Sequence, residues 1–339
     1  MEFEQTLITT KCDRSGSLSK ERYDYQLYLA IFKLLERFFT QEDFVFLFEY
    51  QDDFIIINSN STPKQIEFYQ VKTSTRQEWT LSKIISDDII NKMYQNKLNF
   101  PNNTKSLNFV SNQYCKFMVG MFDRITANTL KKSDKDAIRK SIQKISPDIE
   151  PEFDIIYFEK SKLSIDEYDN QLIGKMSNFI GKIFKEEKCN LRALTLSLIE
   201  MARRKSNNRT DGFKDYNELV KEKGISKKDI EFWLKQSEAY IENKVKWESI
   251  ETNLPKDNAM LNRKLRNEFN NYTLRKMTPD DLLFNTIVDE IIYNLNDKGF
   301  NNKTLFEISN IISKNIHNKY PSFSKELIQA GVLYEYYAN

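Results

Sequence analysis

The chain has 339 residues, of which 29% are charged and 40% are hydrophobic, and its formal net charge is +2. This composition is typical of a globular protein long enough for two domains, and it excludes a disordered chain. No apolar run approaches the roughly 20 residues that span a bilayer, and the N-terminus lacks a signal-peptide pattern, so we expect a cytoplasmic protein with no membrane contact.

The chain contains one histidine, His317, and three widely spaced cysteines, Cys12, Cys115 and Cys189. The cysteine spacing offers neither a zinc site nor a disulfide framework. With a single histidine there is little room for a His-based catalytic triad or a His-rich metal site. Acid–base chemistry must therefore rest on carboxylates, lysine, tyrosine or metal-bound water.

The N-terminal region begins with a helix and continues with three strands. Apolar residues recur at helical spacing over residues 20–39. Strand-like runs follow at 44–49, 54–58 and 66–72, and short polar turns join them. The pattern therefore predicts a helix followed by a three-stranded meander.

The remaining chain is increasingly helical. We expect, in order, a helix from 79 to about 96, a strand at 107–112, a lysine-rich helix at 128–146, a strand at 153–158 and helices at 163–187 and 190–205. Beyond a polar stretch ending at Gly212 there is no strand pattern of note, and helix-start signals stand at Ser226 and Thr278. The sequence thus predicts an α/β domain with a mixed sheet flanked by helices at 1–210, then an all-α assembly or partner-binding module at 213–339.

Polar residues gather at the ends of the predicted strands. Gln70 and Lys72 close the third strand and point to the same side, because side chains alternate along a strand. Asp52 and Asp53 open the second strand, and Glu49 ends the first. The turn between the second and third strands brings the acidic pair toward the amide and the lysine. Such a group can hold a divalent cation and a phosphate together, although the spacing alone also fits a half-buried strand beside a solvated turn.

Charge is unevenly distributed along the N-terminal region. Residues 1–72 contain 8 Lys/Arg and 12 Asp/Glu, a balance of −4, whereas residues 73–145 contain 13 and 6, a balance of +7. An acidic pocket beside a basic surface suits a polyanionic substrate, because lysines that neutralise phosphates release counterions. A charge run is also compatible with an ordinary solvated helix face.

The order of these elements resembles the PD-(D/E)XK nuclease superfamily, in the variant where glutamine replaces the second acid. More narrowly, the region resembles the endonuclease domain of CBASS antiphage effectors, which is shared with the LmuA nuclease subunits of Lamassu systems and with HerA-associated nucleases. The matching segments are Arg14-Ser15-Gly16, Tyr23-Asp24-Tyr25-Gln26, Phe48-Glu49, Asp52-Asp53, the run from Phe68 to Thr73, Trp79-Thr80-Leu81 and the run from Phe109 to Asn112. The resemblance covers at most about the first 210 residues.

The resemblance implies metal-dependent cleavage of double-stranded DNA in antiphage defence. Carried over by position, Asp53 and Gln70 are the metal ligands and Lys72 is the catalytic lysine. Mg²⁺ is the implied cofactor, since it prefers oxygen ligands, and Mn²⁺ is expected to substitute for it.

Three further residues are assigned to the predicted site. Asp52 competes with Asp53 as the main metal ligand, because strand alternation alone does not separate them. Glu49 could supply an additional carboxylate. Gln26, on the first helix, is expected to support the metal ligands from behind.

The resemblance also implies partners. A nuclease without its own sensor or motor would be restrained and activated by an SMC-like or HerA-like ATPase complex, and it would act as a homo-oligomer because both DNA strands must be cut. Two alternatives remain open: a nuclease fold that has lost catalysis and serves as a DNA-binding or interaction module, and a stand-alone restriction or repair endonuclease.

Overall fold

The computed structural model describes residues 2–10, 20–74, 78–118, 122–184, 191–208, 212–241, 245–256, 258–277, 282–296 and 303–338. Two compact units divide the chain. Unit 1 comprises Met1–Lys175 and Ala202–Asp229, and unit 2 comprises Met176–Met201 and Ile230–Asn339. Unit 1 thus includes residues beyond position 212. The division into functional domains at 1–210 and 213–339 remains a prediction.

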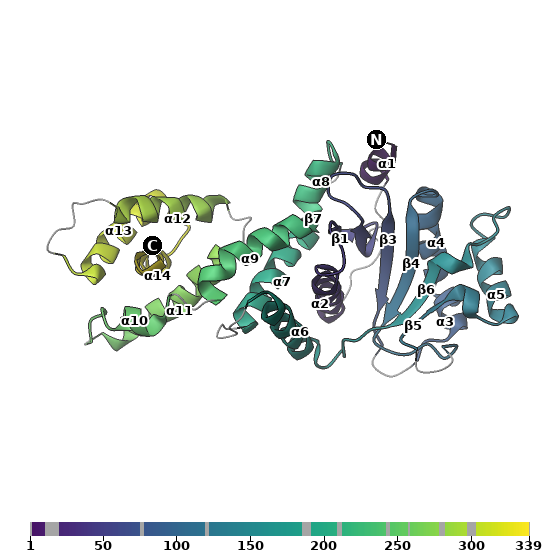
Figure 1. Ribbon diagram of the computed structural model, residues 1–339, viewed down its shortest axis with the longest axis horizontal. Coiled ribbons are helices and arrows are strands. Elements are labelled where there is room, and N and C mark those ends of the chain that lie inside the picture. Colours follow the sequence, from purple (N-terminus) through teal and green to yellow (C-terminus); the bar gives the residue numbers. More distant parts are fainter. Residues whose placement is uncertain are drawn as a thin grey trace. The chain divides into compact units, whose positions relative to one another are not determined.

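Unit 1 is built on a mixed sheet of seven strands in the order β5-β6-β4-β3-β2-β1-β7 (Figure 1). The strands are β1 (Val45–Tyr50), β2 (Asp52–Ile57), β3 (Ile66–Lys72), β4 (Thr104–Ser111), β5 (Arg124–Thr126), β6 (Ile156–Lys160) and β7 (Gly224–Ser226). The first three form the expected antiparallel meander, and β3, β4 and β6 run parallel to one another. The predicted fold class, a mixed sheet flanked by helices before a helical region, is confirmed.

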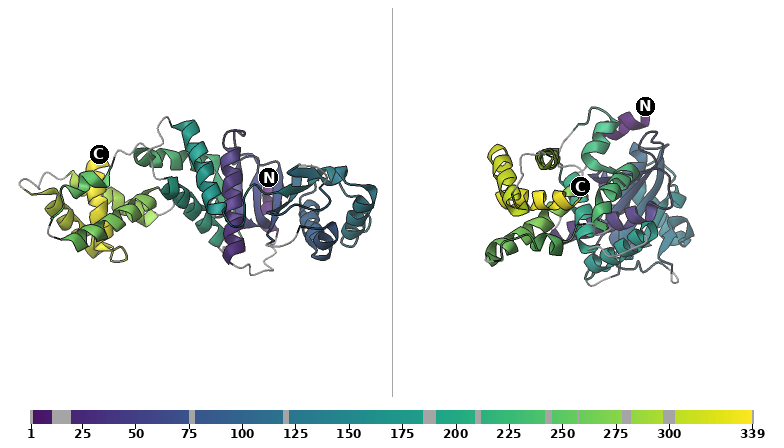
Figure 2. Two further views of the ribbon diagram at one scale, coloured as in Figure 1. Left: turned by 90° about the horizontal axis from the view of Figure 1, so that it is seen from below. Right: turned by 60° about the vertical axis from the view of Figure 1, so that its left-hand side comes forward.

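Helix α2 (Lys20–Arg37) covers one face of the sheet and contacts β1 and β2. It runs as one straight helix beside the strands (Figure 2). On this face the rings of Phe54 and Tyr69 stack with their centroids 4.6 Å apart, and Lys33 lies over the Tyr69 ring. Because neighbouring strand residues point to opposite faces, Ile55 and Phe68 belong to the other side.

The opposite face carries the larger apolar core. Its helices are α1 (Glu2–Thr9), α3 (Leu81–Ser86), α4 (Ile89–Asn99), α5 (Lys132–Ile142) and α8 (Tyr216–Lys223). All five contribute buried side chains to one cluster that includes Ile55 and Phe68. Helix α4 contacts β3 and β4, and α8 contacts β1 and β7. The sheet therefore lies between helices on both of its faces. The ends of its strands carry the polar residues.

Several elements differ from the sequence prediction. The helix expected from 79 to about 96 is two helices, because Asp88 takes a left-handed conformation with φ of 60° between α3 and α4. Aspartate tolerates this conformation better than most residues do. The expected strand at 153–158 starts later, at Ile156, after a 3₁₀ turn (Phe153–Ile155). The edge strands β5 and β7 were not predicted.

The helices that follow β6 contribute to both units. They are α6 (Tyr168–Ile183), α7 (Leu191–Asn207) and α9 (Lys227–Ile241). The helix start predicted at Ser226 is confirmed, since Asp229 N donates to Ser226 Oγ and Ser226 N donates to Asp229 Oδ2. The start signal at Thr278 lies outside the described residues.

The helices α10 (Trp247–Glu251), α11 (Ala259–Lys276), α12 (Leu282–Leu295), α13 (Leu305–Lys319) and α14 (Lys325–Ala338) form the rest of unit 2. Helix α14 contacts α11, α12 and α13 and is buried continuously from Leu327 to Glu335. Figure 1 shows this helix end-on among its neighbours. The last helix of the chain is therefore the core of its unit. None of the described helices is both long and apolar enough to cross a membrane.

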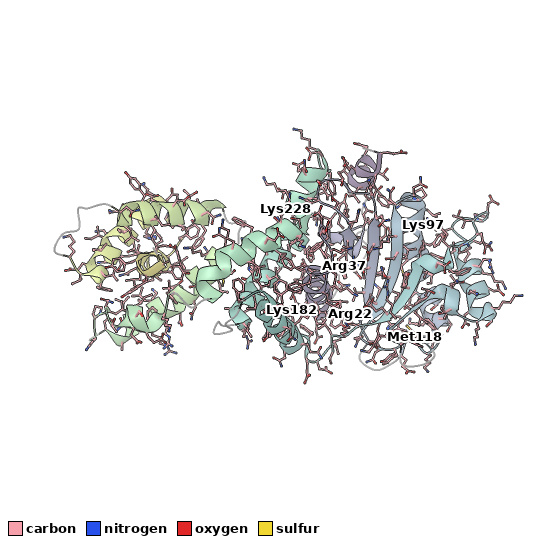
Figure 3. All side chains as sticks on the ribbon, viewed as in Figure 1. Arg22, Arg37, Lys97, Met118, Lys182 and Lys228 are labelled. Carbon is pink, nitrogen blue, oxygen red and sulfur yellow. The ribbon has the colours of Figure 1, made fainter. Side chains whose placement is uncertain are left out.

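An ion-pair network around the buried Glu67 carboxylate ties α2 to the sheet of unit 1. Arg37, labelled in Figure 3, donates to both carboxylate oxygens of Glu67, and Lys105 donates to the same carboxylate at 3.0 Å. Burial alone would raise the pKa of Glu67, but the hydrogen bonds and charges of Arg37 and Lys105 lower it to about 2. The carboxylate is thus held in its charged form in the folded protein.

This network predicts a component of acid lability that Glu67→Gln removes. Since the folded pKa lies below the ordinary value of 4.5, the stabilisation is complete above pH 4.5 and is lost as pH falls toward 2. Between pH 5 and pH 3 we expect the free energy of unfolding of the wild type to drop by on the order of 2 kcal/mol more than that of Glu67→Gln. Urea unfolding at several pH values between 5 and 3 measures the free energy of unfolding of each protein. If that free energy falls equally in the two proteins, the charged Glu67 does not contribute the predicted acid lability.

Candidate active site

The acidic residues of the predicted site lie in the β1–β2 hairpin. Asp52 and Asp53 are the first two residues of β2, and Phe48 pairs with Phe54 while Tyr50 pairs with Asp52. This register puts Glu49 opposite Asp53. Glu49 has a φ of 48°, a left-handed conformation that is unfavourable for a residue with a side chain. Such strain persists only where the surroundings impose it, and it is common at functional sites.

Asp53 is joined directly to the end of β3. Its Oδ2 atom accepts hydrogen bonds from Gln70 Nε2 at 2.7 Å and from Val71 N at 2.6 Å. The regular pairing of β2 with β3 ends at Phe54 and Tyr69. Beyond that point the Val71 N–H donates to the Asp53 side chain. If the pairing continued, this N–H would instead donate to the main chain of β2. Residues 17 positions apart in sequence are thereby brought into contact.

Lys72 ends β3 two residues after Gln70, and both are half-buried while the Val71 between them is buried. The predicted alternation of the strand is therefore present. Lys72 makes no ion pair with the described residues, yet its positive charge lowers the pKa of Asp53 and of Asp52. The structure thus brings Asp53, Gln70 and Lys72 together at one end of the sheet.

Asp52 and Asp53 have different partners. Asp52 Oδ1 accepts from the main-chain N–H of Asp53 at 3.0 Å, and Asp52 Oδ2 accepts from Asn96 Nδ2 of α4 at 3.2 Å. Both oxygens of Asp52 are thereby engaged by the protein itself. Only Asp53 bonds to Gln70, which favours Asp53 over Asp52 as the main ligand of a cation; the roles of both residues remain predictions.

The three acids of the site crowd one another. Burial raises the pKa of Glu49 to about 7, and repulsion from Asp53 adds to this, whereas Lys223 and Lys72 lower it. Burial likewise raises the pKa of Asp52, with repulsion from Asp53 next. It also raises the pKa of Asp53, against the charge of Lys72. Buried acids this close to one another would be relieved by a bound cation.

Gln26, the residue predicted to support the metal ligands, lies on α2 close to the Asp53 carboxylate. It is only 4% exposed, its Nε2 donates to Val71 O at 3.5 Å, and its hydrogen bonding lowers the pKa of Asp53. The Gln26 Oε1 atom is buried and has no hydrogen-bond partner. An unsatisfied buried acceptor is unusual and fits a donor, such as a water molecule, that belongs to the working site.

The residues fit a hard divalent cation held by few protein ligands. Asp53 offers a carboxylate and Gln70 an amide, both of which supply the oxygen that Mg²⁺ prefers. In the structure the nitrogen of the Gln70 amide faces Asp53, and a half-turn of that amide would present its oxygen instead. In the described part of the chain, no three residues among His, Cys, Asp and Glu are grouped to hold a metal. Water and substrate would have to complete the coordination.

Two polar residues near the site, Asn96 and Lys223, were not identified by the sequence analysis, and a third, Asn112, was given no role there. Asn96 holds Asp52, and Lys223 of α8, only 5% exposed, lowers the pKa of Glu49. Lys223 could not be foreseen because it follows the predicted domain boundary. Asn112 was part of a matching segment; it accepts from Ser74 N and donates to Ser74 O, both at 2.8 Å. It thereby fixes the main chain two residues after Lys72.

Other matching segments have mainly structural roles. Thr80 caps the start of α3 by accepting from Lys83 N, and Trp79 forms an isolated β-bridge with Cys115. Tyr25 OH donates to Leu163 O at 2.9 Å and so ties α2 to the chain after β6. The segment Arg14-Ser15-Gly16 lies outside the described residues.

Comparisons with known proteins give one similar protein and one family. The chain is 23% identical over 252 residues to the Lamassu protein LmuA of Bacillus cereus (strain VD014), an alignment that covers 71% of this chain and 69% of that protein. No solved structure matches the chain significantly. The family model described as "Cap4, dsDNA endonuclease domain" matches residues 14–206, which contain every residue assigned to the predicted site. More than half of the chain is covered by that match, and the chain therefore belongs to the Cap4 double-stranded DNA endonuclease family.

Proposed function

We propose that the protein is a metal-dependent endonuclease for double-stranded DNA, of the PD-(D/E)XK type in its glutamine variant, and that it serves as the effector of a bacterial antiphage defence complex. The observation that carries the proposal is the contact of Asp53 with Gln70, with Lys72 on the same strand end. Membership in the Cap4 family supports DNA cleavage, and similarity to a Lamassu protein supports a role in defence.

The side chains of the site would have different roles in the reaction. Asp53 and the Gln70 amide would hold Mg²⁺, which when bound supplies positive charge to the scissile phosphate. Lys72 carries a compact cation that can orient the attacking water and stabilise charge developing on the phosphate oxygens. The attacking water gives up a proton as its oxygen forms a new bond to phosphorus, the bond to one sugar oxygen breaks, and that oxygen takes up a proton from solvent. Asp52 and Glu49 lie beside Asp53 and would add negative charge to the site once a bound cation favours their ionised forms.

Restraint and activation would come from partner proteins. The second unit has a well-packed helical core around α14, which suits a module for assembly. An SMC-like or HerA-like ATPase complex is the partner that we propose, given the similarity to a Lamassu protein. Cutting both strands of a duplex needs two active sites, so the active form would be a homo-oligomer.

A plasmid assay with the full-length protein tests the activity. We expect conversion of supercoiled DNA to linear and shorter fragments with Mg²⁺ or Mn²⁺, no conversion in EDTA, and faster cleavage when the partner ATPase complex is added. Unphased fragment ends would separate an indiscriminate effector from a restriction enzyme, which leaves discrete bands. DNA binding without cleavage under all metal and partner conditions would instead support the inactive interaction module.

A further inference from the structure

Lys160 stands in line with Lys72 at the same end of the sheet. Lys72 of β3 pairs with Ser111 of β4, and Ser111 pairs with Lys160 of β6. Side chains of directly paired residues on neighbouring parallel strands share a face, so the two lysines lie on the same side with Ser111 between them. Ser111 is small and fully buried, which leaves the two ammonium groups as the prominent polar groups of this row.

The surroundings hold the Lys160 ammonium in place without neutralising it. Its Nζ donates to Ser161 O at 2.8 Å and lies 5.7 Å from the centre of the Tyr114 ring. Within the described residues Lys160 forms no ion pair, whereas the adjacent Glu159 is paired with Lys33 at 2.6 Å. Burial lowers the pKa of Lys160, and the negative charge of Asp123, which forms no ion pair with it, raises that pKa. The Lys160 ammonium is thus oriented, partly desolvated and not held in an ion pair.

One exposed aromatic ring lies beside this lysine. It belongs to Tyr114, which is 40% exposed and lies on the connection between β4 and β5, and the 66% exposed Phe122 stands near the end of the same connection. The main-chain N–H of Lys160 donates to Asp123 O at 2.7 Å, which fixes the end of that connection next to β6. A cation beside exposed rings is typical of surfaces that contact nucleic acid.

The spacing of the two lysines matches the repeat of a nucleic acid backbone. Two strand separations place the Cα atoms of Lys72 and Lys160 about 10 Å apart. Phosphates of one DNA strand wind around the helix axis, so the direct distance between successive phosphates is larger than the 3.4 Å axial rise, and about 10 Å spans one to about two nucleotides. One lysine can therefore reach the scissile phosphate while the other reaches a phosphate one or two nucleotides away on the same strand.

We propose that Lys160 binds a non-scissile phosphate of the strand being cut and so positions that strand against Asp53 and Lys72. This inference rests on the proposed endonuclease function and names a substrate-positioning residue for it. Lys160 does not touch the reacting atoms; it contributes to binding and register.

The test measures how DNA binding depends on salt. Full-length Lys160→Gln, which keeps the stem and a donor for Ser161 O, is compared with Lys160→Arg and with Lys64→Gln. Lys64 is an exposed lysine of the same unit at the opposite end of β3. A fluorescent duplex is titrated in EDTA at several salt concentrations, and cleavage in Mg²⁺ is measured in parallel.

For Lys160→Gln we expect the slope of log K against log salt to shrink by about 0.9, and affinity near 0.1 M salt to fall about eightfold on duplexes of any sequence. In cleavage we expect KM to rise with little change in kcat, because a ground-state contact is lost. Lys160→Arg should keep the salt slope, the affinity and KM near the wild-type values, and Lys64→Gln should match the wild type in all three.

The inference is overturned if Lys160→Gln leaves the salt slope and KM like those of Lys64→Gln while the wild type binds and cuts DNA. If the wild type neither binds nor cuts DNA with or without partners, the endonuclease function itself fails, and this inference fails with it. Thermal unfolding of each variant verifies that the fold is retained.

Discussion

Asp53→Asn and Lys72→Ala should each lower the rate of DNA cleavage by on the order of 10²–10³-fold, the loss typical when one charge-stabilising group is removed from an active site. Asparagine at position 53 retains an oxygen for the Val71 N–H but loses the charge that would hold a cation. Alanine at position 72 removes the one lysine at the end of β3. Initial rates on a supercoiled plasmid at saturating Mg²⁺ measure both effects.

The two substitutions should move stability in opposite directions. Asp53 lies close to Asp52 and Glu49; burial raises the pKa of the three acids, and repulsion from Asp53 raises it further in Asp52 and Glu49. Removing the Asp53 charge relieves this repulsion, so Asp53→Asn should unfold at an equal or higher temperature than the wild type in metal-free buffer. Lys72→Ala removes the charge that offsets the acids and should be less stable.

Two further variants complete this experiment. Lys64→Ala removes an exposed lysine far from the site and should leave cleavage unchanged. Asp52→Asn should reduce cleavage less than Asp53→Asn does, because the oxygens of Asp52 bond to Asp53 N and Asn96. If Asp52→Asn proves the more damaging of the two, the ligand assignment is reversed; if Asp53→Asn and Lys72→Ala both cut at the wild-type rate, the site lies elsewhere.

The strands around the site could be predicted because their patterns are local. β3 spans Ile66–Lys72, the range expected from its apolar run and its preceding turn. The alternation that separated Gln70 and Lys72 from Val71 is a property of any strand and needs no knowledge of partners. The same reasoning gave the meander and most of the helices of unit 1.

Other features depend on contacts that no local pattern contains. β5 and β7 are three residues each, too short for a period, and they exist because β6 and β1 offer unpaired edges. The choice between Asp52 and Asp53 depends on Asn96, which is more than forty residues away. The left-handed conformation of Glu49 is imposed by the hairpin register. Lys223 reaches the site only because α8 folds back onto β1.

Glu335→Ala should destabilise unit 2 by about 3–5 kcal/mol, the range typical when one partner of a buried ion pair is removed. Glu335 of α14 is fully buried, and its carboxylate accepts from Lys276 Nζ at 2.6 and 2.7 Å and from Tyr272 OH at 2.7 Å. Alanine would leave the buried Tyr272 hydroxyl and the partly buried Lys276 ammonium of α11 without this acceptor. The free-energy cost of removing these two groups from water would then no longer be compensated by hydrogen bonds to Glu335.

Unit 2 contains its own matched control for this prediction. Lys264 and Glu326 also join α11 to α14, at 2.7 Å, but Lys264 is 57% exposed. A solvated pair of this kind contributes at most about 1 kcal/mol, so Glu326→Ala should have a small effect. Hydrogen exchange of the α14 amides, read by mass spectrometry, reports the local opening free energy of both variants. Equal losses would show that solvent reaches Glu335 in solution and that α14 is not the closed core of its unit; a large loss for Glu335→Ala alone would establish that the helical module is held together through its last helix.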